Sequence, residues 1–310
     1  MPMIHVERLR CAYGSVVAVD DLSFTSRPGE IFGLLGPNGA GKTTCISCIC
    51  GLLKPTAGRV SVMGHDTAED GRRARQALGV VPQEIALYDD LSAAENLAYW
   101  GGAHGMHGRA LRERVQEVLE WTGLADRARE PVARFSGGMK RRLNFACGIV
   151  HRPQVLLLDE PTVGVDPQSR VRLLELTREL ARNGATVLYT THYMEEAESL
   201  CDRVVIIDRG RILAQGTLPE LRSLLGERDL VRFSGVFQPE LVRQILNGGG
   251  IEIVQAEENV VTLALQDASG HLPSIFAMMG RAHAEIRGTR LSQPSLESLF
   301  IKLTGKELRE

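Results

Sequence analysis

A glycine-rich stretch near the N-terminus has the residue types and spacing needed to bind phosphate. Residues 36–43 read Gly-Pro-Asn-Gly-Ala-Gly-Lys-Thr, after an apolar run at 31–35 and before a periodic segment at 45–50. Glycines allow backbone N–H groups to converge on phosphate oxygens, and a helix start adds partial positive charge. The pattern predicts a phosphate-binding P-loop, in which Lys42 reaches the β- and γ-phosphates of a nucleotide and Thr43 binds Mg²⁺.

A second glycine-containing stretch also has the character of an anion-binding helix start. It reads Phe-Ser-Gly-Gly-Met over residues 135–139 and leads into an arginine-rich and then apolar segment. A serine followed by two glycines suits a helix N-terminus, whose backbone N–H groups attract anions. Two such termini, far apart in the sequence, indicate two surfaces that contact phosphate.

Polar residues that suit nucleotide chemistry follow three of the apolar runs. Gln83, the pair Asp159 and Glu160, and His192 each come directly or shortly after a predicted strand. Open α/β sheets bind ligands at the carboxyl ends of their strands. We therefore expect Asp159 to hold Mg²⁺, Glu160 to polarise an attacking water and His192 to donate to a γ-phosphate. A helix-capping turn would also explain two adjacent acids, but the P-loop favours the Mg²⁺ site.

Four other residues have weaker functional interpretations. Tyr13, in a turn between two N-terminal strands, could stack on an adenine ring, although a turn tyrosine is more often simply packed. Asp166 precedes a proline and is expected to cap a helix. His104 and His107 could bind a metal, but no third ligand is nearby, so ordinary loop histidines are favoured.

The composition is that of a globular protein with no strong overall charge. The formal net charge is −2, which gives little attraction to nucleic acid or acidic lipid. The basic clusters at 72–75 and 140–142 are interpreted as solvated helix faces. Cys45 and Cys48 form a Cys-x-x-Cys motif, for which small buried hydrophobes are favoured over a redox or metal role. No apolar run approaches the ~20 residues that span a bilayer.

The elements that must position these residues alternate between strands and helices. An α/β fold with a mixed sheet is predicted for residues 1–226, with a helical subdomain at about 88–152. Residues 227–310 show the order β-α-β-β-α-β. This order suggests a small C-terminal α+β domain of the ferredoxin-like type.

In this order and spacing, the motifs of residues 1–226 resemble the ATP-binding cassette of ABC transporters. Residues 36–43 match the Walker A motif, Gln83 the Q-loop, residues 135–139 the signature, and 155–160 the Walker B motif with its following glutamate. Asp166 matches the end of the D-loop and His192 the switch histidine. The signature differs from Leu-Ser-Gly-Gly-Gln by Phe135 and Met139. Its Ser-Gly-Gly-Met form, followed by three basic residues, is similar to the drug- and antibiotic-resistance exporter branch.

The resemblance implies a set of site residues. For catalysis it implies Glu160, His192 and Gln83, and for Mg²⁺ it implies Thr43, Gln83 and Asp159. The residues implied for ATP are Tyr13, Gly36, Pro37, Asn38, Gly39, Ala40, Gly41, Lys42, Thr43, Thr44, Ser136, Gly137, Gly138 and Asp166.

The resemblance further implies an ATPase that dimerises head to tail with a second copy of itself. The signature of one subunit would cap the ATP bound by Lys42 and Thr43 of the other. Closure and opening would drive a separate membrane permease, received in a groove near Gln83 and residues 92–122. The protein would then lie in the cytoplasm, peripheral on the inner face of the cell membrane. The alternative is a soluble ABC ATPase acting on ribosomes or nucleic acid, and we expect no nucleic-acid partner because the chain is nearly neutral.

Overall fold

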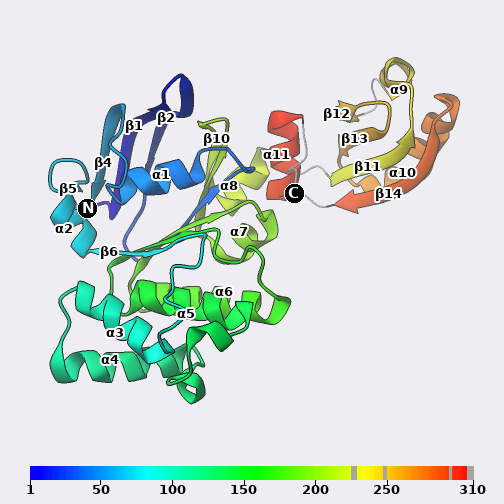
Figure 1. The fold of residues 1–310 in the computed structure, drawn as a ribbon. Coiled ribbons are helices and arrows are strands. Elements are labelled where there is room, and N and C mark those ends of the chain that lie inside the picture. Colours follow the sequence, from blue (N-terminus) through cyan, green and yellow to red (C-terminus); the bar gives the residue numbers. More distant parts are fainter. Residues whose placement is uncertain (225–228, 247–249, 293–294, 306–310) are drawn as a thin grey trace. The chain divides into compact units, whose positions relative to one another are not determined.

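A computed structural model describes residues 1–224, 229–246, 250–292 and 295–305 (Figure 1). The chain divides into two compact units, Met1–Gln215 and Gly216–Glu310. The boundary expected between 226 and 227 lies outside the described residues. The division falls earlier because helix α8 (Leu218–Ser223) packs against helix α11 (Leu296–Thr304), and both belong to the second unit.

The N-terminal unit contains an antiparallel sheet with the strand order β2-β1-β4-β5. Its strands are β1 (Ile4–Tyr13), β2 (Val16–Thr25), β4 (Ala57–Val62) and β5 (His65–Asp66). Tyr13 is the last residue of β1, where it pairs with Val16, and is not part of a turn as predicted. The expectation failed because register shifts after Val6 and Leu9 interrupt the inward–outward alternation that identifies a strand.

The larger sheet of this unit carries the strands that precede the predicted site residues. Its order is β10-β9-β3-β8-β7-β6, and β9, β3, β8, β7 and β6 pair in parallel. Its strands are β3 (Ile31–Leu35), β6 (Leu78–Val81), β7 (Val155–Asp159), β8 (Thr186–Thr191), β9 (Arg203–Asp208) and β10 (Arg211–Thr217). Strands β3, β7 and β8 are buried along their whole length, as expected for parallel strands covered on both faces. Because these strands run the same way, their carboxyl ends meet at one edge.

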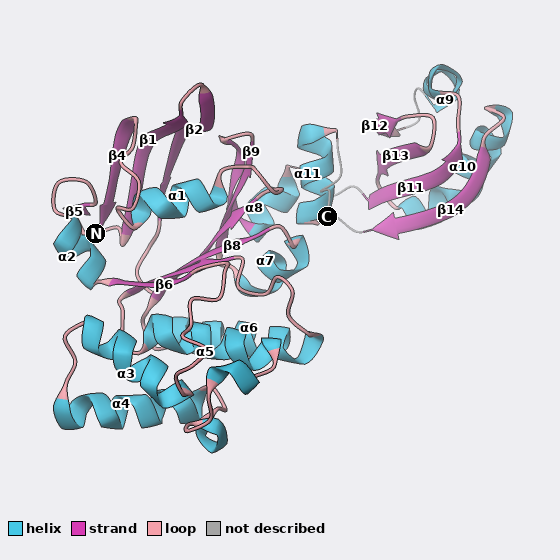
Figure 2. Cartoon of the chain, in the orientation of Figure 1, coloured by secondary structure: helices cyan, strands magenta, loops and turns pink. Residues whose placement is uncertain are grey.

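Helices cover both faces of the larger sheet (Figure 2). They are α1 (Lys42–Ile49), α2 (Gly71–Gln76), α3 (Ala93–Ala103), α4 (Gly108–Trp121), α5 (Gly137–Ile149), α6 (Pro167–Arg182) and α7 (Met194–Leu200), with 3₁₀ turns at Ala125–Arg127 and Val132–Arg134. Helix α1 lies between the two sheets, where Cys45, Cys48 and Ile49 belong to one core with residues of both. Helices α3, α4 and α5 pack together on the opposite face (Figure 1). The predicted α/β fold with its helical region is confirmed.

The C-terminal unit contains its own sheet and core. Its remaining elements are β11 (Asp229–Val236), α9 (Pro239–Leu246), β12 (Glu252–Ala256), β13 (Val260–Leu265), α10 (Ala268–Arg281) and β14 (Glu285–Ser292). The strands pair antiparallel in the order β12-β13-β11-β14. The β-α-β-β-α-β sequence of elements is that of a split βαβ unit. Its core includes Phe233, Val242, Leu263 and Met279.

Candidate nucleotide-binding site

The P-loop joins β3 to α1, and its shape depends on glycine. Gly39 and Gly41 have φ angles of 80° and 108°, in the left-handed region that other residues rarely adopt. A Cβ atom on Gly41 would also lie 2.6 Å from the carbonyl oxygen of Ala18. Glycine is therefore required at Gly41 both for the backbone angle and for the close approach of β2. The loop ends at the N-terminus of α1, where phosphate binding was predicted.

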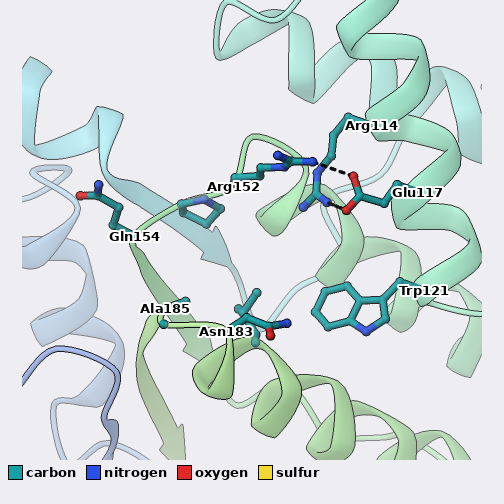
Figure 3. A pocket seen from close by; sticks show the side chains of 10 residues that line it. Arg114, Glu117, Trp121, Arg152, Gln154, Asn183 and Ala185 are labelled. Atoms are coloured by element: carbon teal, nitrogen blue, oxygen red, sulfur yellow. Dashed lines mark hydrogen bonds and ion pairs between the residues drawn. The ribbon is translucent and has the colours of Figure 1, made fainter.

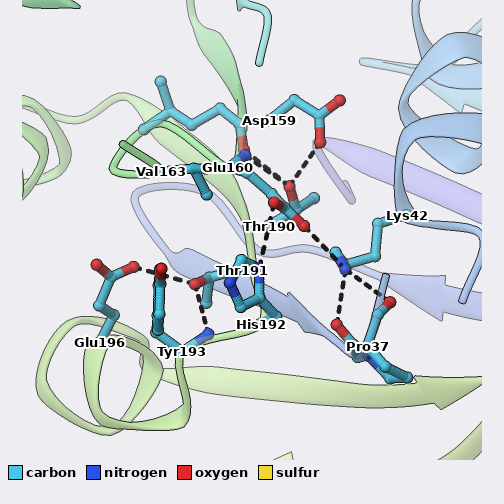
Figure 4. A network of polar contacts seen from close by, with 12 residues as sticks. Pro37, Lys42, Asp159, Glu160, Val163, Thr190, Thr191, His192, Tyr193 and Glu196 are labelled. Carbon is cyan, nitrogen blue, oxygen red and sulfur yellow. Dashed lines mark hydrogen bonds and ion pairs between the residues drawn. The ribbon is translucent and has the colours of Figure 1, made fainter. Parts of the chain in front are cut away.

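The Lys42 ammonium is buried inside this loop (Figure 4). It donates to the carbonyl oxygens of Gly36 at 2.6 Å and Pro37 at 2.9 Å. It also forms an ion pair with Glu160 Oε1 at 2.9 Å, and both side chains are about one-twentieth exposed (4% and 5%). The two residues predicted to contact the γ-phosphate and the attacking water are thus in direct contact. A phosphate group must compete with Glu160 for Lys42.

Asp159, the last residue of β7, is a buried carboxylate. Burial raises the pKa of Asp159, and hydrogen bonds from the Thr190 and Thr43 hydroxyls partly oppose this rise. The Thr190 hydroxyl donates to Asp159 Oδ1 at 2.8 Å. A carboxylate and a hydroxyl oxygen are hard ligands that suit Mg²⁺, and a divalent cation would offset the cost of burying the charge. The donor set formed by Thr43 and Asp159 therefore fits this ion.

Glu160 is held in an unusual backbone conformation next to His192. Its φ angle is 45°, and its backbone N–H donates to the Thr190 hydroxyl at 3.0 Å. Glu160 Oε2 lies 3.2 Å from His192 Nδ1. Left-handed backbone at a residue other than glycine stores of order 1–3 kcal/mol and is concentrated at functional sites. The carboxylate is thus fixed between Lys42 and His192 (Figure 4).

Lys42, Thr43 and Glu160 line a cleft of about 390 Å³, whereas Asp159 and His192 are not part of its lining. The cleft is lined by Ala18, Asn38, Gly39, Gly41, Lys42, Thr43, Thr44, Gln83 and Glu160. Gln83 enters it from the segment after β6, as predicted from its place at a strand end. Ala18 was missed, because an alanine in a strand gives no chemical signal. Tyr13 is not part of this lining, and its side chain is half-exposed at the end of β1.

The signature residues lie outside the lining of this cleft. Ser136 caps α5 by accepting a hydrogen bond from the Met139 N–H at 3.3 Å, and both Ser136 and Gly137 are exposed. Gly138 is buried, and a Cβ atom there would lie 2.7 Å from Asp166 Oδ2. Asp166 caps α6 as predicted. The fold therefore places the signature beside the D-loop and leaves the N-terminal end of α5 facing outward.

Sequence patterns did not identify Glu196, a buried carboxylate in α7. Its Oε2 accepts hydrogen bonds from Tyr189 at 2.8 Å and Thr191 at 3.0 Å, and its Oε1 pairs with Arg170 of α6 at 2.6 Å. Thr191 also accepts from the backbone of Tyr193. His192 lies in the turn after β8 (Figure 4). Glu196 thus ties this turn to α6, the helix that follows the D-loop. No spacing rule marks such a residue, because its partners come from two other elements, β8 and α6.

The prediction of a solvated helix face at 140–142 was wrong. Arg141 is buried and donates to backbone carbonyls of residues 82, 83 and 163. Arg142 donates to the Thr122 carbonyl at 2.9 Å. Both arginines lie on the side of α5 that packs against other elements, where hydrogen bonding to backbone replaces hydration. The arginines of the cluster at 72–75 are exposed, as predicted.

The cysteines are structural. All six are free and buried, and burial raises the pKa of Cys48 and of Cys50 to about 12. Such thiols stay protonated and unreactive at neutral pH. Within the described residues no group of three His, Cys, Asp or Glu side chains is placed to hold a metal. His104 instead stacks on His151, with ring centroids 3.5 Å apart.

A second cavity, of about 530 Å³, lies near the starts of β7 and β8, at the opposite ends of these strands from the P-loop (Figure 3). It contains Arg114 and Arg152, which suggests an anion site at first sight. Glu117 pairs with both, at 2.9 Å each. Arg114 also donates to the carbonyls of Ile149 and Val150. Because Glu117 offsets one of the two positive charges and both guanidinium groups already have partners, this cavity does not have the character of a phosphate site.

The fold and the cleft define a P-loop nucleotide hydrolase. Residues 19–163 match the family described as ABC transporter. The chain is 42% identical to the linearmycin resistance ATP-binding protein LnrL of Bacillus subtilis (strain 168), over 99% of this chain and 100% of that protein. It is 40% identical to the Nod factor export ATP-binding protein I of Ralstonia nicotianae, over 100% and 96%.

A solved structure described as the ATP binding subunit of an ABC transporter is also similar. It has a TM-score of 0.67 and 33% identity, and the match covers 72% of this chain and 93% of that one. The chain therefore belongs to the family of ATP-binding subunits of ABC transporters, and it is an ATPase. No helix in the described parts of the chain is long and apolar enough to cross a membrane.

Proposed function

We propose that this protein is the ATP-hydrolysing subunit of an ABC exporter, which dimerises head to tail on ATP and drives a separate membrane permease. One observation carries the proposal. The cleft is lined by the P-loop, Gln83 and Glu160, whereas Ser136 and Gly137 face outward beside the D-loop. A second copy, placed head to tail, would bring its signature to the open side of the cleft. The relatives named for resistance and export support the exporter assignment.

The roles proposed for the P-loop, Asp159, Glu160 and His192 follow from their contacts, and those proposed for Tyr13 and Asp166 follow from the family resemblance. The P-loop from Gly36 to Thr44 binds the phosphates, with Lys42 leaving Glu160 for the γ-phosphate. Thr43 and Asp159, with Gln83, hold Mg²⁺, which neutralises phosphate charge when bound. Freed from Lys42, the Glu160 carboxylate orients a water and accepts its proton, while His192 holds Glu160 Oε2 and contacts the γ-phosphate. Tyr13 stacks on the adenine. Asp166 contacts the nucleotide bound by the partner.

We assign the permease contact to an apolar groove beside Gln83. Its volume is about 420 Å³. Its lining is Cys50, Leu52, Arg75, Leu78, Val80, Pro82, Ala86, Trp100, His104, Asn144, Cys147, Gly148 and His151. Leu52 is 75% exposed. A permease segment with an apolar body would cover it. The protein would then lie on the cytoplasmic face of the cell membrane.

The dimer is tested by its dependence on Ser136. Glu160→Gln, which slows hydrolysis, should form a dimer with Mg-ATP in light scattering. Adding Ser136→Glu should abolish the dimer by placing negative charge against phosphate, while the single chain still binds ATP. Ser92→Glu is the matched control, because Ser92 is also a serine at a helix N-cap, at the start of α3. A dimer that persists with Ser136→Glu would contradict the head-to-tail arrangement.

A further inference from the structure

Arg141 is a buried cation that is bound only by backbone carbonyls among the described residues. Its side chain lies on α5, and the residue is 5% exposed. Nη1 donates to the Gln83 carbonyl at 2.7 Å and to the Pro82 carbonyl at 3.3 Å, and Nη2 donates to the Val163 carbonyl at 3.1 Å. No carboxylate in the described chain forms an ion pair with it. Removing a charged group from water is costly, so a buried guanidinium without a carboxylate partner depends on all of its hydrogen bonds to carbonyls.

The carbonyls bound by Arg141 belong to two loops of the nucleotide cleft. The first loop carries Gln83, whose side chain lines the cleft while its carbonyl is held by Arg141. The second carries Val163, whose backbone N–H donates to the Glu160 carbonyl at 3.3 Å. Arg141 itself lies in the first turns of α5, shortly after the signature. One guanidinium therefore connects the signature helix to the loops that hold Gln83 and Glu160.

A second side chain of α5 holds the same loop. Asn144, one turn after Arg141, accepts from the Ala86 N–H at 3.1 Å and donates to the Pro82 carbonyl at 3.3 Å. The loop from 82 to 86 is thus attached to α5 at two points. Any displacement of α5 relative to the sheet must move this loop or break these bonds.

We infer that Arg141 is a positioning residue, which sets the place of Gln83 in the cleft and links it to the signature helix and the D-loop. Lysine cannot replace it, because one ammonium nitrogen cannot span carbonyls that the planar guanidinium reaches with two. The inference rests on the proposed role of Gln83. It goes beyond that role by naming the residue that couples Gln83 to the phosphate-capping helix.

The test is a double-mutant cycle on the ATPase rate of the full chain, with Arg141→Lys and Gln83→Ala. Arg141→Lys should lower kcat by about tenfold to a hundredfold, as expected for a displaced catalytic group, and change ATP binding by less than about twofold. The double variant should be no slower than Gln83→Ala alone, because both changes remove the same function. Arg142→Lys is the matched control, since among the residues that the structure describes Arg142 donates only to the Thr122 and Gly123 carbonyls, away from the cleft. It should leave kcat within about twofold, and its effect should be additive with that of Gln83→Ala.

The inference is overturned if the Arg141 and Gln83 effects multiply, or if Arg141→Lys leaves kcat unchanged. If Arg141→Lys does not fold, Arg141→Gln, which keeps two N–H donors and buries no charge, takes its place with the same expected cycle. If Gln83→Ala alone has no effect on kcat, the role of Gln83 fails and the inference fails with it. The dimer measurement with Ser136→Glu is independent of this result, so failure of the proposed dimer can be recognised separately.

Discussion

The stacked pair His104 and His151 in the apolar groove should make the protein sensitive to mild acid. The pKa of His151 is lowered from 6.5 to about 4. Burial is the larger cause, and the nearby charge of His104 is the second. Its Nε2–H donates to the Leu78 carbonyl at 2.9 Å, so a second proton would go to Nδ1, which has no acceptor in the described chain. Arg114 adds further repulsion. The native state therefore holds His151 neutral.

The sign of the effect follows from linkage. Between pH 6.5 and about 4 the unfolded chain binds a proton at His151 that the native state does not, so stability falls as pH falls through this window. The full difference between the pKa of His151 in the unfolded and native states corresponds to a loss of about 3 kcal/mol in the free energy of unfolding. Partial solvent exposure of the ring reduces this to about 2 kcal/mol.

The assay is urea unfolding of wild type and His151→Gln across this pH window. The variant loses packing at every pH, so only the pH dependence of the difference is informative. Wild type should lose about 2 kcal/mol relative to His151→Gln on acidification. His107→Gln, at an exposed histidine just before α4, is the control and should track wild type. A difference between wild type and His151→Gln that does not change with pH would refute the reasoning.

Three further predictions concern the nucleotide-binding site and the residues that support it. Glu160→Gln should lower kcat by about 10²–10⁴-fold with ATP binding retained, measured by phosphate release, and a loss below tenfold would exclude a base role. Glu196→Gln should destabilise the protein by about 2 kcal/mol in urea unfolding, because Arg170 loses its counter-charge, whereas Glu195→Gln at the exposed neighbour should have no effect. Burial raises the pKa of Asp159, so without nucleotide and Mg²⁺ Asp159→Asn should melt above wild type at neutral pH. That advantage should shrink as acid protonates Asp159, and a constant advantage would contradict it.

The parts of the site that could be predicted from sequence are those fixed by local rules. The P-loop needs glycines at left-handed positions and a lysine at a helix start, and these appear as a spacing in the sequence. Gln83, Glu160 and His192 were found because they follow apolar strands, and parallel strands deliver their carboxyl ends to one edge. These residues therefore come together in the structure.

The residues that were missed are those whose role depends on contacts between distant elements. Arg141 and Glu196 look like surface charges in the sequence, because nothing local shows that their helix faces are covered. Tyr13 was placed in a turn because the shifted register of β1 hides the strand that contains it. In each case tertiary packing, rather than local pattern, decides the outcome.

The central claim, an ATPase subunit that drives a membrane permease, is tested most directly by capture of the partner. Tagged Glu160→Gln with Mg-ATP would be used on detergent-solubilised membranes, with Leu52→Glu added to charge the groove and Lys42→Ala added to remove ATP binding. The account predicts that one polytopic membrane protein is recovered in near-equal amount with Glu160→Gln and is lost with either addition. Recovery of ribosomal proteins or nucleic acid, with no membrane protein, would contradict the account and assign the same ATPase chemistry to a soluble machine.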